Sequence, residues 1–188
     1  MNVDDDKHAV RQYVAELKNR YDAATLQKLS SAIITRLEQS PLFITADTVA
    51  CYCALPTEVQ TEALIAKWNK TKTLLLPVTD EGKLRWYAYH SDIKMTKSQL
   101  RITEPVPEGE EIPSCEIDLV IVPGIAFDRR LNRLGRGKGY YDRFLASFDK
   151  PVVGLCFGFQ LFDTIPADIH DIKMTQIITE NEVIRADS

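Results

Sequence analysis

The residues best suited to chemistry lie between Arg133 and Asp142, where three glycines alternate with cationic side chains in the string RLGRGKGYYD. A glycine has no Cβ, so the backbone at each of them can approach a ligand closely. Backbone N–H groups at the start of a helix, together with Arg136 and Lys138, make a site for anions. The fork-shaped guanidinium of Arg133 suits phosphate oxygens. The segment therefore predicts a phosphate-binding loop.

The glycines of this loop have the spacing G-x-G-x-G, at Gly135, Gly137 and Gly139. The P-loop has G-x-x-x-x-G-K-[ST] and the dinucleotide motif has G-x-G-x-x-G, so neither common nucleotide pattern accounts for it. A glycine-rich turn with solvated cations is the alternative interpretation. An ordinary turn, however, rarely needs three glycines and three cations within seven residues.

Charged residues outside the loop extend the candidate site. Asp142 ends the loop, and a carboxylate beside bound phosphates is a usual ligand of Mg²⁺; a first-turn helix carboxylate is an equal alternative. Lys7 and Arg11 are four residues apart, so they share one face of a helix and are placed to reach a phosphate chain. A solvated cationic face is the alternative for that pair. His170-Asp171, taken alone, reads as an ordinary loop dipeptide.

Other kinds of active site are not indicated. The chain has no G-x-S-x-G elbow and no His/Asp arrangement that marks a serine nucleophile. Its three histidines, His8, His90 and His170, are too scattered for a metal-hydrolase site. The aromatic residues of the segment 86–89 are placed to line a ring pocket, but a cluster of this kind in a strand is more often part of a core.

The composition describes an ordinary globular chain of 188 residues, which we expect to form one domain over residues 1–188. A net charge of −4 argues against general nucleic-acid binding. No apolar run approaches the ~20 residues that span a bilayer, and the acidic start is no secretory signal. The four cysteines predict buried, reduced thiols. We therefore expect a cytoplasmic monomer that acts on small molecules and binds neither membrane nor nucleic acid.

The order of expected elements indicates an α/β protein with a parallel sheet, because apolar runs of strand length alternate with helical periodicity. The expected helices cover residues 5–20, 25–39, 60–69 and 139–148. The expected strands cover residues 48–55, 74–78, 84–89, 118–122, 152–157 and 176–179. The proline- and glutamate-rich stretch 104–113 is expected to be an extended surface connection.

A set of short segments runs along nearly the whole chain: Lys7-x-x-x-Arg11, Glu58-Val-Gln-Thr61, Ile102-Thr-Glu-Pro105, Asp118-Leu-Val-Ile-Val-Pro-Gly-Ile-Ala-Phe-Asp128, Arg133 to Asp142 followed by Arg143-Phe144-Leu145, and then Gln160, Ile165-Pro166 and His170-Asp171. In these segments the chain resembles the 5-formyltetrahydrofolate cyclo-ligase family, also called methenyltetrahydrofolate synthetases. The family usually has a glycine where this chain has Leu131, and many members have an acid where Gln60 stands.

This resemblance implies a three-layer α/β/α sandwich around a mostly parallel sheet. It also assigns roles to individual residues. ATP would be bound by Lys7, Arg11, Arg133, Leu134, Gly135, Arg136, Gly137, Lys138, Gly139, Tyr140 and Tyr141. The folate would be contacted by Leu55, Glu58, Gln60, Arg136, Gly137, Lys138, Gly139 and Tyr140. Magnesium would be held by Asp142 and Asp171, and Arg136 and Lys138 would be the catalytic side chains.

The reaction that the resemblance implies converts 5-formyltetrahydrofolate and ATP into 5,10-methenyltetrahydrofolate, ADP and phosphate. Phosphorylation of the formyl oxygen creates a leaving group, and N10 of the folate then attacks the activated carbon. This route needs no protein nucleophile; the protein aligns two substrates and stabilises the charge on the moving phosphoryl group. Two alternatives stay open: a sugar-phosphate isomerase on a similar scaffold, and a non-catalytic nucleotide-binding regulator.

Overall fold

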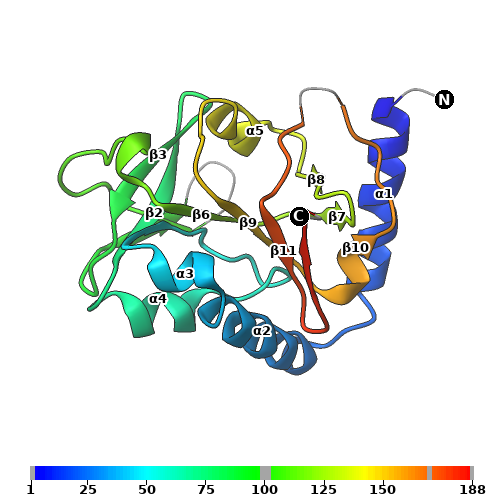
Figure 1. The fold of residues 1–188 in the computed structure, drawn as a ribbon, viewed down its shortest axis with the longest axis horizontal. Helices are drawn as coiled ribbons and strands as arrows, with labels where there is room; N and C mark the ends of the chain where they lie inside the picture. Colours follow the sequence, from blue (N-terminus) through cyan, green and yellow to red (C-terminus); the bar gives the residue numbers. More distant parts are fainter. Residues whose placement is uncertain (1–2, 98–102, 169–170, 187–188) are drawn as a thin grey trace.

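A computed structural model describes residues 3–97, 103–168 and 171–186 of the chain. Within these residues the central feature is a seven-stranded sheet with the order β12-β11-β9-β6-β1-β2-β3 (Figure 1). Neighbouring strands from β11 to β2 run parallel, and β3 and β12 pair antiparallel at the two edges. The strands are β1 (Thr48–Ala50), β2 (Thr73–Asp80), β3 (Lys83–Ala88), β6 (Leu119–Val122), β9 (Val152–Leu155), β11 (Gln176–Ile178) and β12 (Val183–Arg185).

Layers of helix and loop cover both faces of this sheet. Because side chains alternate along a strand, Leu74 and Leu76 of β2 point into one core cluster and Leu75 points into the other. The first cluster lies against α2 (Ala23–Glu38), α3 (Pro41–Thr45) and α4 (Glu62–Trp68), and the second against α5 (Tyr140–Leu145) (Figure 1). The three-layer α/β/α sandwich around a mostly parallel sheet is thereby confirmed.

Shorter elements complete the chain. The helix α1 (Val3–Lys18) packs through Val14 on Ala126, Leu134 and Ile165, at one side of the molecule. No helix among the described residues is long and apolar enough to cross a membrane. The remaining elements are β4 (Met95–Lys97), β5 (Thr103–Pro105), η1 (Ser114–Glu116), β7 (Ala126–Asp128), β8 (Arg133–Leu134), η2 (Gly158–Gln160) and β10 (Leu161–Phe162), of which β10, β7 and β8 form a small sheet and β4 pairs with β5.

The expected strand–helix–strand unit is present, since β1, α4 and β2 follow one another and the two strands pair in parallel. The strand expected over residues 48–55 is too long, because β1 ends at Ala50 and the N–H of Cys51 makes the last bond to β2, with the carbonyl of Leu75. The hydroxyl of Tyr52 donates to the carbonyl of Val59 (2.7 Å), and the hydroxyl of Thr61 donates to the carbonyl of Tyr52 (2.8 Å). These two bonds close a loop instead of extending a strand.

Three other expectations need correction. The stretch 104–113 is not purely a surface connection, because Thr103–Pro105 is a strand and Glu104 is 5% exposed. The helix expected over 139–148 covers only Tyr140–Leu145. Cys115 is exposed, although the other three cysteines are buried or half-buried as expected, and all four thiols are free.

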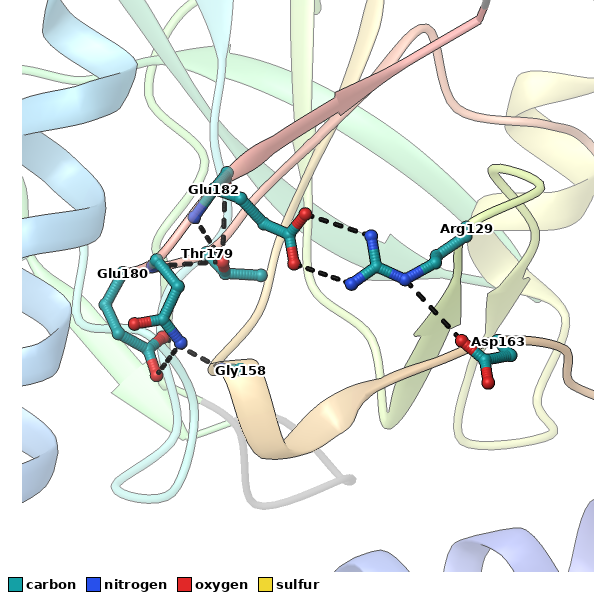
Figure 2. A network of polar contacts seen from close by, with 7 residues as sticks. Arg129, Gly158, Asp163, Thr179, Glu180 and Glu182 are labelled. Atoms are coloured by element: carbon teal, nitrogen blue, oxygen red, sulfur yellow. Dashed lines mark hydrogen bonds and ion pairs between the residues drawn. The ribbon is translucent and has the colours of Figure 1, made fainter.

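A polar network fastens the hairpin of β11 and β12 to the rest of the fold (Figure 2). Arg129, after β7, donates two hydrogen bonds to Glu182 (2.9 and 2.7 Å) and lies 3.6 Å from Asp163. The backbone N–H of Gly158 donates to Glu180 (2.8 Å). Arg129 holds the pKa of Glu182 below its usual range. Since these groups are largely exposed, they orient the hairpin more than they stabilise the fold.

Two glycines make room for a buried aromatic ring beneath the second core cluster. Phe127 of β7 is fully buried. A Cβ added at Gly154 would lie 2.4 Å from one edge of its ring, and a Cβ added at Gly124 would lie 2.4 Å from the other. Gly154 belongs to β9 and Gly124 follows β6. The Phe127 ring therefore packs the small sheet of β10, β7 and β8 against the seven-stranded sheet.

Candidate active site

A pocket of about 850 Å³, including its open mouth, lies beside the carboxyl ends of β1 and β6. Ligands bind at this edge of parallel sheets because the loops that follow the strands gather there. Its walls come from the segment after β1, from β2, β3 and β5, from the segment after β6, and from the glycine-rich loop. The lining residues are Tyr52, Cys53, Leu55, Glu58, Pro77, Thr79, Leu84, Glu104, Pro123, Gly124, Arg133, Gly135, Arg136, Gly137, Lys138, Gly139, Tyr140, Tyr141 and Asp142.

The glycine-rich loop joins β8 to α5 and has left-handed backbone at two positions. Gly137 has a φ of +90° and Gly139 a φ of +69°. L-amino acids with a Cβ rarely adopt these conformations, so glycine is required for this path of the backbone. The path leaves Lys138 exposed between them, where it makes no hydrogen bond or ion pair with any described residue. The side chain is therefore free to meet a ligand.

The side chain of Arg133 is fixed at the base of the loop. It is 4% exposed and donates to Asp142 at 2.5 Å and to the carbonyl of Pro123 at 3.4 Å. Its guanidinium lies 5.5 Å from the centre of the Tyr141 ring. Its Nε has no partner among the described residues, although it is buried. A buried donor without a partner is costly. The bonds to Asp142 and Pro123 nevertheless hold the guanidinium in one orientation at the pocket wall.

Glu58 connects the loop after β1 with the glycine-rich loop. Arg136 donates to one of its carboxylate oxygens (3.0 Å), and the N–H of Leu55 donates to the other (3.0 Å). The side-chain amide of Gln60 donates to the carbonyls of Leu55 (2.7 Å) and Glu58 (2.8 Å). Gln60 thus braces the turn and is not among the residues that line the pocket.

The N-terminal helix approaches the loop from outside the pocket. Arg11 donates to the carbonyl of Gly135 at 3.0 Å, and Lys7 pairs with Asp171 at 2.8 Å. The structure therefore brings Arg11 next to the glycine-rich loop and Lys7 next to Asp171, but none of the three lines the pocket. Asp171 contacts Lys7, whereas Asp142, the other predicted magnesium ligand, contacts Arg133.

Burial controls the ionisation of several groups at the site. It raises the pKa of Tyr141 well above the usual range, and the carboxylate of Glu58 adds to this, so the hydroxyl stays neutral. Burial also raises the pKa of Tyr52. It lowers the pKa of Lys18, at the end of α1, and Glu58 partly offsets this effect. Lys18 is 8% exposed and does not line the pocket.

The predicted site residues thus divide into two groups. Leu55, Glu58, Arg133, Asp142 and the residues from 135 to 141 all line the pocket. The side chain of Leu134 instead belongs to the core cluster with Val14, because it points away from the ligand face of β8. The lining residues that sequence reasoning missed are Tyr52, Cys53, Pro77, Thr79, Leu84, Glu104, Pro123 and Gly124.

Leu131 has the backbone conformation of a glycine, with a φ of +69°. It follows a turn in which the buried carboxylate of Asp128 accepts from the N–H groups of Arg130 and Asn132, both at 2.9 Å. The strained conformation costs about 1–2 kcal/mol. Leu131 is 6% exposed in the second core cluster, and this burial offsets the cost. The departure from the expected glycine therefore preserves the turn.

We expect Cys115 to react with iodoacetamide much faster than the other thiols in the native protein. Burial raises the pKa of Cys51 and of Cys53 to about 12, so little thiolate forms at about pH 8. Peptide mass spectrometry after brief labelling measures the rates, and Cys115→Ser should abolish the fast reaction. Fast labelling of Cys156, whose pKa burial also raises, would contradict the structure.

Comparison with known proteins supplies a family for this geometry. A model of the 5-formyltetrahydrofolate cyclo-ligase family matches residues 3–180. The 5-formyltetrahydrofolate cyclo-ligase of Escherichia coli strain K12 is 30% identical over 165 residues, which cover 84% of this chain and 91% of the relative. The counterpart from Mycolicibacterium smegmatis is 31% identical over 182 residues, covering 92% of this chain and 93% of the relative.

Solved structures agree with this match. The NMR structure of 5,10-methenyltetrahydrofolate synthetase from Aquifex aeolicus superimposes with a TM-score of 0.87 at 34% identity, covering 97% of this chain and 94% of that one. A 5,10-methenyltetrahydrofolate synthetase from Mycoplasma pneumoniae gives a TM-score of 0.75 at 22% identity, covering 93% and 99% of the two chains. The latter similarity supports the fold alone.

Proposed function

Because the chain belongs to the 5-formyltetrahydrofolate cyclo-ligase family, we propose that its pocket carries out the ATP-dependent cyclisation of 5-formyltetrahydrofolate to 5,10-methenyltetrahydrofolate. One observation carries the proposal: the cationic glycine-rich loop and a largely apolar wall line the same pocket. A nucleotide phosphate on the loop and a flat folate ring against the wall would share one enclosed space, as phosphoryl transfer between them requires.

The chemistry begins with the formyl oxygen of the folate, which is a poor leaving group. It attacks the γ-phosphorus of ATP, the bond to the β-phosphate oxygen breaks, and ADP leaves. N10 then attacks the formyl carbon, the C–O bond breaks, and phosphate departs with the oxygen. N10 loses its proton to solvent or phosphate, leaving the methenyl bridge. Each step moves negative charge between oxygens, so cationic donors fixed in advance are the main contribution of the protein.

The side chains of this chain divide that work. Arg133 is oriented by Asp142 and lines the pocket, where its positive charge would attract a phosphate. Lys138 makes no hydrogen bond or ion pair with the described residues and can follow the transferred group. Arg136, which now pairs with Glu58, can keep that pairing or exchange it for a phosphate as the substrates bind. In these roles the glycine-rich loop would contact both the nucleotide and the folate.

We also propose that magnesium accompanies the nucleotide. Among the described residues no group of three His, Cys, Asp or Glu side chains is arranged to hold a metal ion. This fits Mg²⁺, which usually takes one or two carboxylates and completes its shell with phosphate oxygens and water. Asp142, with its side chain 41% exposed at the pocket, would be the nearer ligand, and Asp171 the second. When bound, the ion would neutralise charge on the phosphates.

A cytoplasmic location and a monomeric state belong to the same proposal. Four free thiols suit a reducing compartment. The substrates would be small molecules, and the net charge of −4 does not favour nucleic acid.

The test is direct turnover. We expect purified protein, 5-formyltetrahydrofolate, ATP and magnesium to give a rise in near-ultraviolet absorbance, because a methenyl bridge conjugates with the reduced pterin. ADP and phosphate should form in equal amounts, and omission of ATP should abolish the rise. Absence of an ATP-dependent rise would overturn the proposal. ATP binding without turnover would favour a regulator, and turnover of a sugar phosphate without ATP would favour an isomerase.

A further inference from the structure

Three carboxylates line the pocket, those of Glu58, Glu104 and Asp142, and their surroundings differ. Asp142 has a cationic partner in Arg133. Glu58 has a cationic partner in Arg136. Glu104 of β5 is 5% exposed and has no cationic partner in the part of the chain that the structure describes. Its two oxygens accept from the backbone N–H (3.2 Å) and the hydroxyl (2.8 Å) of Thr79 on β2. No role for Glu104 follows from the phosphate chemistry above.

The environment of Glu104 makes it an incomplete recognition site. A carboxylate has about four positions for accepting hydrogen bonds, and Thr79 uses two of them. The residues that line the pocket beside it, Pro77, Leu84 and Cys53, come from β2, β3 and the segment after β1, and they offer apolar surface. Burying a carboxylate costs free energy when too few donors surround it. A ligand that donates hydrogen bonds to Glu104 would offset much of that desolvation cost and bind more tightly.

The ligand group that completes this site is defined by its chemistry. It must be flat, to lie between apolar side chains, and it must donate two N–H bonds side by side, as a guanidinium does to a carboxylate. The 2-amino-4-oxopyrimidine ring of a pterin has this edge, in its exocyclic amine and N3–H. The glutamate tail of a folate, which carries carboxylates, would be repelled by Glu104.

We propose that Glu104 is the specificity-determining residue for the pterin ring, accepting hydrogen bonds from the 2-amino group and N3–H of the folate. This inference rests on the proposed function and assigns the orientation of its substrate. With the pyrimidine edge at Glu104, the other ring of the pterin, which carries N5 and the formyl group, lies further from β5. The formyl oxygen is thereby directed toward the loop that bears Arg136 and Lys138.

The experiment compares two ligands on two proteins. Calorimetry without ATP gives Kd for 5-formyltetrahydrofolate and for its 2-desamino analogue, with the wild type and with Glu104→Leu. We expect wild type to bind the analogue about 10-fold more weakly, and Glu104→Leu to bind 5-formyltetrahydrofolate about 30-fold more weakly than wild type does. Glu104→Leu should bind the two ligands alike. KM for ATP should change less than about threefold, since the phosphate loop is untouched.

Controls separate this role from others. Glu108→Gln removes an exposed carboxylate from the same segment and should leave both Kd values unchanged. The comparison of ligands on wild type holds even if Glu104→Leu folds poorly. Equal binding of the two ligands by a wild type that forms the methenyl product would overturn the role of Glu104 and leave the proposed function intact. Preference for the 2-amino ligand without any turnover would support the pterin contact and overturn the proposed function.

Discussion

Replacing Lys138 by alanine should lower kcat for methenyl formation by about 100-fold or more, the usual consequence of losing one preorganised donor to a developing oxyanion. The structure explains why the effect should fall on catalysis. Lys138 is exposed, lines the pocket and makes no hydrogen bond or ion pair with another described residue. Its removal therefore breaks nothing in the free protein, and the melting temperature should stay within about 2 °C of wild type.

Steady-state kinetics with both substrates saturating, together with a thermal melt, measures this prediction. Lys28→Ala is the matched control, since Lys28 is an exposed lysine of α2 far along the chain from the pocket segments. Its kcat should equal that of wild type. Lys138→Arg should recover part of the lost rate, because it keeps the charge in a different geometry. A native kcat for Lys138→Ala would show that the loop amides and arginines alone stabilise the transferred group.

Replacing Gly154 by alanine should destabilise the fold by about 3 kcal/mol, at the upper end of the range for overpacked cores. The new Cβ would lie 2.4 Å from the ring of Phe127, which is fully buried. The ring has no room to retreat, because its opposite edge lies where a Cβ on Gly124 would be. For a chain of this length the melting temperature should fall by roughly 6–12 °C.

A second substitution tests whether the ring is the cause. Phe127→Leu removes the crowded atoms, so the double variant Gly154→Ala/Phe127→Leu should be more stable than the sum of the single effects by at least about 1 kcal/mol. Gly109→Ala is the control for backbone effects, since Gly109 has a φ of +83° and open space around it. Gly109→Ala should lower the free energy of unfolding by only about 1 kcal/mol. If Gly154→Ala lowered the free energy of unfolding less than Gly109→Ala does, the close packing of residue 154 against the Phe127 ring would be contradicted.

The central strands could be predicted because a parallel sheet covered on both faces produces continuous apolar runs. Leu119–Val122 is one such strand, with all four residues buried. The glycine-rich loop could also be predicted from the sequence, since its glycines and cations are adjacent in the chain. Short strands such as β7, β8 and β10 were missed, because two or three residues carry no periodic pattern and depend on pairing with distant segments.

The site could be predicted only where its residues belong to one local string. Glu104 lies in the segment Ile102-Thr-Glu-Pro105, yet nothing local shows that its carboxylate is buried beside Thr79 of another strand. The bonds of Gln60 were equally hidden from the sequence, because its side-chain amide donates to the carbonyls of Leu55 and Glu58 in its own turn. The contact of Gln60 with folate stays a prediction.

The contact between Lys7 and Asp171 joins residues 164 positions apart in the chain. A ribosome adds about 5–20 residues per second, so roughly 10–30 s separate the synthesis of these two side chains. During this interval α1 has emerged, but its docking surface on Ala126, Leu134 and Ile165 is only partly made. We therefore expect nascent chains to gain nucleotide affinity only near the end of translation, with the apolar face of α1 open to chaperones until then.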